Sequence, residues 1–280
     1  MSYADLTCFD VDVNAGIACT TIANGPINLL DGKFFVEMAS LIRRFEESSD
    51  VRVIVFKSAN PSFFLAHADI TEFTSLPSEP PFRGGRAGGV IGALDRLRTM
   101  AKPSIALIAG ICRGGGSEFA LACDMRFAAI GKAVFGQPEA GLGITPGAGA
   151  MTRLARLVGR GRALEILLGS GDFSAEEAQL YGWINRAVPA EDLDKFGMDL
   201  AQHIASFPPE TVALIKQHLQ HGEEQLGQAL IFEEQSFLRS ANFPEAKERM
   251  RIALKHGLQT VPVETASISE LWDRDRKSVV

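Results

Sequence analysis

The feature that most constrains this chain is a glycine-rich turn between an apolar segment and an amphipathic one. Residues 104–109 (SIALIA) are typical of a buried strand, and Gly114, Gly115 and Gly116 follow shortly before a helical pattern. Three consecutive glycines let backbone N–H groups approach a ligand closely, because no Cβ atom stands in the way. N–H groups at the start of a helix lack backbone acceptors and lie in a positive dipole field. The turn therefore predicts a site for an anion, or for a carbonyl oxygen that gains negative charge during a reaction.

Two carboxylates accompany this turn. Glu118 lies directly after the glycines, and Glu139 follows a second Gly/Pro turn. A trap for a carbonyl oxygen beside two carboxylates indicates an enzyme that moves protons next to a carbonyl group. The simpler alternative is that each residue only favours the first turn of a helix, where the dipole stabilises acidic side chains. We interpret Asp69 and Asp124 as structural carboxylates: Asp124 bonds backbone N–H groups, and Asp69 caps a helix that begins near Ile70.

Strand and helix patterns alternate along the first half of the chain. The first thirty residues predict short strands, and apolar residues at helical spacing predict a helix over 32–48. From about Arg153 onward the pattern is nearly all helical, and Ser174 with Glu177 forms a capping box. This order predicts an α/β core followed by a helical region. The further segments expected are strands at 51–56, 104–109 and 125–129, a loop at 75–89, a helix at 90–100 and helices opening at Pro208 or Pro209 and at Pro244.

Composition excludes several classes of protein. The chain has 280 residues, is 46% hydrophobic and carries a net charge of −6, so it offers no general attraction for nucleic acid. Its four cysteines show no Cys-x-x-Cys spacing and predict reduced core thiols in a cytoplasmic protein, without a metal site. We expect neither a signal peptide nor a membrane span.

Several motifs together resemble the crotonase family of enoyl-CoA hydratases and isomerases. They are GGGSE at 114–118, GQPE at 136–139, TPGAG at 145–149 and FFLAHADI at 63–70, supported by SAEEA at 174–178 and YGWINRAVP at 181–189. Their order and spacing match the family over roughly residues 5–257. The resemblance implies a spiral of ββα repeats with a C-terminal helical trimerisation region. We expect a core with the acyl-CoA site at 1–200, a helical region at 201–257 and an extension of unknown role at 258–280.

The resemblance also implies an activity. Ala68 and Gly115 would form an oxyanion hole for the thioester carbonyl, and Glu118 and Glu139 would add water to a 2-enoyl-CoA, as in fatty acid metabolism. The expected assembly is a homotrimer or a dimer of trimers, and no cofactor is expected beyond the coenzyme A of the substrate. Open alternatives are an isomerase, an acyl-CoA or diketone hydrolase, or a non-catalytic binding protein. The substrate-binding residues that the resemblance implies are Ala66, Asp69, Ile70, Ile111, Arg113, Gly114, Pro138 and Leu142.

Two residues depart from the family pattern. His67 stands where the family usually has glycine, and Arg113 precedes the glycines where small or apolar residues are common. Because histidine titrates near neutral pH and arginine suits a carboxylate, we hypothesise that the acyl group is polar or acidic. The alternative is that both side chains face away from the substrate and pair within the protein.

Overall fold

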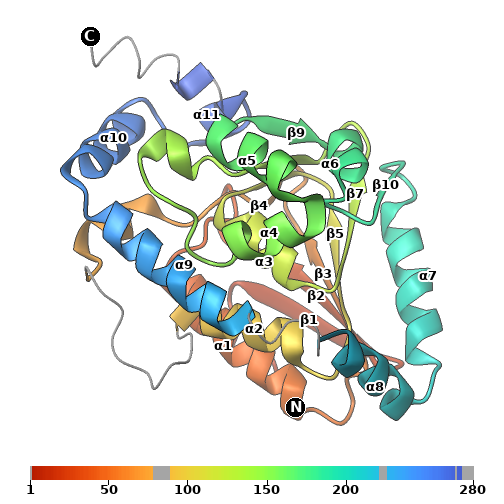
Figure 1. Ribbon diagram of the computed structural model, residues 1–280. Coiled ribbons are helices and arrows are strands. Elements are labelled where there is room, and N and C mark those ends of the chain that lie inside the picture. The colour runs from red at the N-terminus through yellow and green to blue at the C-terminus, as the bar shows by residue number, and fades with distance from the viewer. Residues whose placement is uncertain (1, 78–88, 221–225, 269, 273–280) are drawn as a thin grey trace.

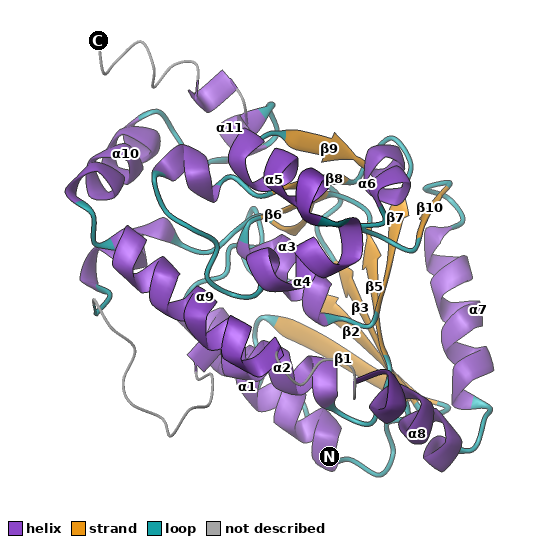
Figure 2. Ribbon diagram, in the orientation of Figure 1, coloured by secondary structure: helices purple, strands orange, loops and turns teal. Residues whose placement is uncertain are grey.

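The computed structural model describes residues 2–77, 89–220, 226–268 and 270–272, and its strands form two sheets (Figures 1 and 2). The first sheet has the order β1-β2-β3-β5-β7-β10, and the second has the order β4-β6-β8-β9. The first sheet comprises β1 (Phe9–Asn14), β2 (Ile17–Ile22), β3 (Val53–Ser58), β5 (Ser104–Ile108), β7 (Met125–Ala129) and β10 (Arg186–Val188). The second comprises β4 (Phe63–Leu65), β6 (Ile111–Arg113), β8 (Val134–Gly136) and β9 (Asp172–Ser174).

The chain enters the two sheets in turn. Strands β3, β5 and β7 lie in the first sheet, and each is followed by a short strand of the second sheet, β4, β6 and β8. Apart from the antiparallel pairs β1–β2 and β8–β9, the strand pairs are parallel. This repeated strand–strand–helix order is the predicted spiral of ββα units. The three-residue strands of the second sheet were not predicted, because a run of three residues carries no measurable period.

Helices cover both faces of the first sheet. On one face, Val53, Val55 and Leu107 pack against α7 (Leu193–Ala205), which runs along the sheet in Figure 1. On the other face, Ile54 and Phe56 join the large core with the early helices. The helices up to residue 142 are α1 (Gly32–Glu47), the 3-10 helix η1 (Ile70–Ser75), α2 (Gly89–Thr99), α3 (Gly115–Ala122) and the 3-10 helix η2 (Glu139–Leu142). Successive residues of these strands therefore point alternately to the core on one face and to the core on the other face, as expected for a sheet that is buried on both faces.

The second half is helical, as predicted, but β9 and β10 interrupt it. Its helices are α4 (Ala150–Val158), α5 (Arg160–Gly169), α6 (Ala175–Tyr181), α7, α8 (Pro209–Gln220), α9 (Leu226–Ala241), α10 (Pro244–Lys255) and α11 (Val261–Glu264). The capping box of Ser174 and Glu177 is present. The boundary expected after residue 200 falls inside α7. Most of the loop expected at 75–89 lies outside the described residues.

Within the described residues, no helix combines the length and apolar character needed to cross a membrane.

Candidate active site

Two neighbouring parallel strands bring the two predicted oxyanion donors together. Strand β4 pairs with β6, with Phe63 opposite Ile111, and the chain reaches Ala68 after β4 and Gly115 after β6. A Cβ atom placed on Gly115 would lie 3.3 Å from the backbone nitrogen of Ala68. Neither the N–H of Ala68 nor that of Gly115 donates a hydrogen bond to a described residue, and both residues line the same cavity. Two adjacent N–H groups without protein acceptors form a ready site for a carbonyl oxygen.

Each of the three glycines has its own physical reason. Gly114 adopts φ +47°, a left-handed conformation that disfavours other residues. A Cβ atom on Gly116 would stand 2.2 Å from the carbonyl oxygen of Leu65, so α3 can pack against β4 only with glycine there. Gly115 leaves open the space beside Ala68 N. The motif therefore encodes a turn, a close packing contact and an open donor pair in three successive positions.

Glu118 is fixed by the N-terminus of another helix. It is 3% exposed, and its Oε1 accepts hydrogen bonds from Ala148 N (2.7 Å) and Ala150 N (3.0 Å) at the start of α4. Burial raises the pKa of Glu118 to about 7, with a further rise from the charge of Glu233, while the two N–H groups and Arg153 lower it. Glu118 can therefore exchange a proton near neutral pH.

Glu139 opens η2 beyond β8, next to β6 in the second sheet. With the Gln137 amide nitrogen facing this carboxylate, that nitrogen donates to Glu139 Oε2 (3.0 Å), and the amide oxygen accepts from Ser117 Oγ (3.0 Å). Burial, and then the charge of Glu118, raise the pKa of Glu139 well above its ordinary value. Because the two buried carboxylates repel each other's charge, the pair holds a proton at neutral pH, which provides one acid and one base.

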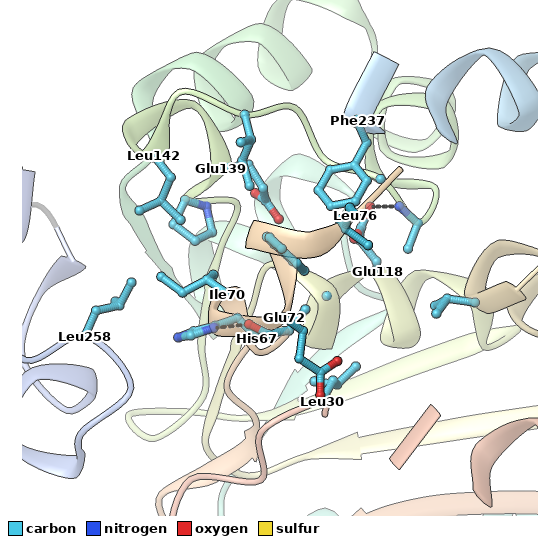
Figure 3. A pocket seen from close by; sticks show the side chains of 18 of the residues that line it. Leu30, His67, Ile70, Glu72, Leu76, Glu118, Glu139, Leu142, Phe237 and Leu258 are labelled. Carbon is cyan, nitrogen blue, oxygen red and sulfur yellow. Dashed lines mark hydrogen bonds between the residues drawn. The ribbon is translucent and has the colours of Figure 1, made fainter. Parts of the chain in front are cut away.

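Ala68, Gly115 and the two carboxylates line one cavity of about 250 Å³. Glu118 and Glu139 can be seen at this cavity in Figure 3. His67 and Glu72 also line the cavity, and the rest of its wall is apolar. Residues of the wall include Leu30, Phe35, Ile70, Phe73, Leu76, Val90, Pro138, Leu142, Ile144, Phe237, Leu258 and Trp272. Among the predicted binding residues, Ile70, Pro138 and Leu142 therefore face the cavity. Ala66, Asp69, Ile111 and Gly114 are not part of this wall, and their contact with substrate stays a prediction.

The family model described as "Enoyl-CoA hydratase/isomerase" matches residues 12–255. The chain belongs to this family. It is 36% identical over 239 residues to the short-chain-enoyl-CoA hydratase of Clostridium acetobutylicum, covering 84% of this chain and 89% of the relative. It is 32% identical over 230 residues to the crotonyl-CoA hydratase of Syntrophomonas wolfei, and the match covers 82% of this chain and 87% of the relative. A crystal structure from Streptomyces avermitilis, provisionally assigned as an enoyl-CoA hydratase, is 34% identical to this chain. The two structures superpose with a TM-score of 0.87, and the match covers 97% of this chain and 99% of the other.

These similarities confirm the predicted family, the crotonase-like fold and an enzyme of the enoyl-CoA hydratase/isomerase class. The similarity to named hydratases also agrees with the predicted reaction. Within the described residues of this hydratase/isomerase family member, no group of three or more His, Cys, Asp and Glu side chains could hold a metal ion.

Arg113 does not lie on the cavity wall of this family member, which contradicts its predicted contact with the acyl group. It is 1% exposed, and its Nε and Nη2 donate to the two carboxylate oxygens of Asp172 at 2.7 and 2.8 Å. Its Nη1 and Nη2 also donate to the carbonyl oxygens of Glu264 (2.7 Å) and Ala266 (3.1 Å). Its donors are used within the protein, so the hypothesis of an acidic acyl group loses its basis.

His67 is also paired within the protein. Its Nδ1 contacts Ala68 O (2.8 Å) and its Nε2 contacts Glu264 Oε1 (2.8 Å). Burial alone would lower the pKa of His67, but the charge of Glu264 and both hydrogen bonds raise it above its ordinary value. A protonated ring donates through both nitrogens, as these two acceptors require. The pair links the oxyanion segment to α11.

The extension expected to have an unknown role forms part of the site. Leu258 and Trp272 line the cavity, and the Trp272 indole nitrogen donates to Ser170 O (3.0 Å). A Cβ atom on Gly141 in η2 would stand 2.5 Å from the Trp272 ring, so the ring lies directly on the helix that carries Glu139. Besides the Arg113 and His67 contacts, Ile268 N donates to Asp172 Oδ2 (3.0 Å).

Sequence reasoning missed four further residues at the site. Gln137 and Ser117 lie inside the recognised motifs, so their polar side chains beside Glu139 offered a signal that was not used. Glu233 has no such signal: it is one of two adjacent acids in a long helix, and its contacts with the start of α4 join residues 81 to 84 positions apart. Phe237 from α9 covers Gly147 and packs edge-on against Phe73, with ring centroids 5.1 Å apart.

Proposed function

We propose that this protein hydrates short-chain 2-enoyl-CoA thioesters by syn addition of water. The observation that carries this proposal is the pair of N–H groups of Ala68 and Gly115, which have no described protein acceptor and share a cavity with two buried carboxylates. Membership in the enoyl-CoA hydratase/isomerase family supplies the substrate class.

In the proposed reaction the thioester carbonyl oxygen accepts hydrogen bonds from both N–H groups. Ionised Glu118 takes a proton from water as the water oxygen bonds to C3, and the electron pair of the C2–C3 double bond moves toward the carbonyl. The oxyanion hole stabilises the negative charge that develops there. Protonated Glu139 then supplies the proton to C2. The proton that Glu118 took from water passes to Glu139 before the next turnover, so that the net reaction adds one water molecule and restores both carboxyl groups.

The cavity wall favours a short, apolar acyl group. Phe73, Leu76 and Phe237 present hydrocarbon to the cavity. His67 also lines it, but both of its ring nitrogens are paired within the protein, and Arg113 lies outside the wall. The relatives named as short-chain and crotonyl-CoA hydratases are consistent with this choice. We propose no cofactor beyond the coenzyme A of the substrate, a cytoplasmic location and a role in fatty acid metabolism.

We also propose self-association as a trimer or a dimer of trimers. Four apolar residues of α9, Leu226, Leu230, Phe237 and Leu238, are not available for this contact. Three of them are buried in the protein's own core, and Phe237 lines the cavity. Large apolar side chains are exposed instead on α5, α8 and α9: Leu164, Leu168, Leu214, Ile215, Leu219 and Phe232. Exposed apolar side chains of this size could be covered by contact with another chain.

The absorbance of the conjugated thioester of crotonyl-CoA tests the reaction. A hydratase removes this absorbance without releasing free thiol. An isomerase creates it from a 3-enoyl-CoA, and a thioesterase releases free coenzyme A. A protein that does none of these over a panel of acyl-CoA thioesters would contradict the proposal.

A further inference from the structure

A third buried carboxylate belongs to the network around the catalytic pair. Glu233 lies in α9, is 1% exposed and accepts hydrogen bonds from Gly149 N (2.9 Å), Met151 N (3.1 Å) and Thr152 N (2.9 Å). Its Oε2 also accepts a hydrogen bond from Thr152 Oγ1. The N-cap residue of α4 is Gly149, which has no side chain to cap the helix. Glu233 therefore supplies this cap from a distant part of the chain.

The same turn holds the catalytic base. The N–H groups of Ala148 and Ala150 point to Glu118, whereas those of Gly149, Met151 and Thr152 point to Glu233. The two carboxylates thus divide one helix N-terminus between them. Because successive peptide groups are rigidly connected, a shift of the turn toward or away from Glu233 also moves the N–H groups that hold Glu118.

We propose that Glu233 is a positioning residue for the reaction: by capping α4 it fixes the turn that orients the carboxylate of Glu118. This inference rests on the proposed hydratase function.

The charge of Glu233 acts on the same carboxylate. The charged groups that influence Glu118 are Glu139 from η2, Glu233 from α9 and Arg153 from α4. After burial, the charge of Glu233 is the next cause that raises the pKa of Glu118, while Arg153 lowers it. Removal of this negative charge should therefore lower the pKa of Glu118 and shift the pH at which it becomes a base downward.

The isosteric substitution Glu233→Gln tests whether Glu233 affects catalysis as well as stability. The amide oxygen can still accept hydrogen bonds from one part of the turn. The negative charge and the acceptor for the other N–H groups of the turn are lost. We expect kcat for crotonyl-CoA to fall about 10- to 100-fold, as for other small misplacements of a catalytic group. KM should stay within about twofold, because Glu233 lies outside the cavity wall. The rising limb of the pH–rate profile should move to lower pH.

Two further variants control the experiment. Thr152→Val removes the hydroxyl donor but leaves the charge of Glu233, so a smaller fall in kcat with an unmoved pH limb is expected. Glu47→Gln changes an exposed carboxylate at the end of α1 and should change nothing. If Glu233→Gln lowers the Tm but leaves both kcat and the rising limb of the pH–rate profile as in the wild type, Glu233 is only a structural cap, and the proposal is overturned.

A titration without substrate distinguishes this inference from the proposed function. Carboxyl carbon NMR of ¹³C-labelled protein, with the Glu118 signal assigned through Glu118→Gln, reports the ionisation of Glu118 directly. The signal should titrate at lower pH in Glu233→Gln than in the wild type. An unchanged titration would refute the coupling, even if the wild type hydrates crotonyl-CoA. A shifted titration in a protein that hydrates no enoyl-CoA would uphold the coupling and reject the hydratase.

Discussion

The substitution Gly115→Ala tests the oxyanion hole with a single methyl group. The added Cβ would stand 3.3 Å from Ala68 N and 3.5 Å from Ala68 Cβ. A carbonyl oxygen that accepts from Ala68 N must lie about 2.9 Å from that nitrogen, so the methyl group crowds the space that the oxygen needs. Gly115 is not in the left-handed region, and alanine favours helix more than glycine does. We therefore expect the protein to fold normally and to lose activity.

The expected loss equals that of one oxyanion donor. Such a loss costs about 3 kcal/mol of transition-state stabilisation, or about 10²- to 10³-fold in kcat. Initial rates on crotonyl-CoA at saturating substrate, together with a thermal melt, measure both quantities. Activity close to that of the wild type in a folded Gly115→Ala protein would show that the carbonyl lies elsewhere.

Two other glycines serve as matched controls. Gly116→Ala would bring its Cβ within 2.2 Å of Leu65 O, so it should mainly lower stability, by about 1–3 kcal/mol. Gly161, in α5, has no atom within 4 Å of such a Cβ, so Gly161→Ala should leave activity and stability nearly unchanged. Equal losses of activity in all three folded variants would refute the assignment of the hole to Gly115.

Three further predictions concern the acids, the buried histidine and the assembly. Glu118→Gln and Glu139→Gln should each reduce hydration by about 10²- to 10⁴-fold in folded protein, and near-full activity of either on every enoyl-CoA would refute the two-glutamate mechanism. The pKa of His67 is raised in the folded protein, so its pair with Glu264 stabilises the fold most when the ring is protonated. This contribution is complete at a pH below the pKa of histidine in the unfolded chain. It is lost as the pH rises through the higher pKa of His67 in the folded protein. Denaturant titrations should show this alkaline fall in unfolding free energy for the wild type but not for His67→Gln; equal pH dependence in both would contradict it. Light scattering at micromolar concentration should give a multiple of the 30.2 kDa chain mass, and a monomer would contradict the trimer.

The sequence predicted the parts of the fold that have a strong local signal. The helix at α1 shows a clear apolar period, and the strands β5 and β7 are short segments of mostly apolar residues, so their bounds were predicted to within a residue or two. Strands β4, β6 and β8 have only three residues each, and their pairing depends on contacts between distant segments. The position of Ala68 beside Gly115 was therefore available only from the family resemblance.

The side chains that depart from the family pattern show the limit of motif reading. Arg113 and His67 lie close in sequence to the oxyanion donors, and proximity suggested contact with substrate. In the structure their partners are Asp172 and Glu264, which lie 59 and 197 residues away in the chain. Short-range patterns hold no information about such partners, so a charged residue near a motif does not identify its ligand.

A crystal structure of Glu139→Gln with bound crotonyl-CoA tests the central claim most directly, because the slowed variant should retain the substrate. We predict that the thioester carbonyl oxygen lies about 2.7–3.2 Å from both Ala68 N and Gly115 N, with C3 facing Glu118. A carbonyl oxygen outside hydrogen-bond reach of both nitrogens would contradict the account.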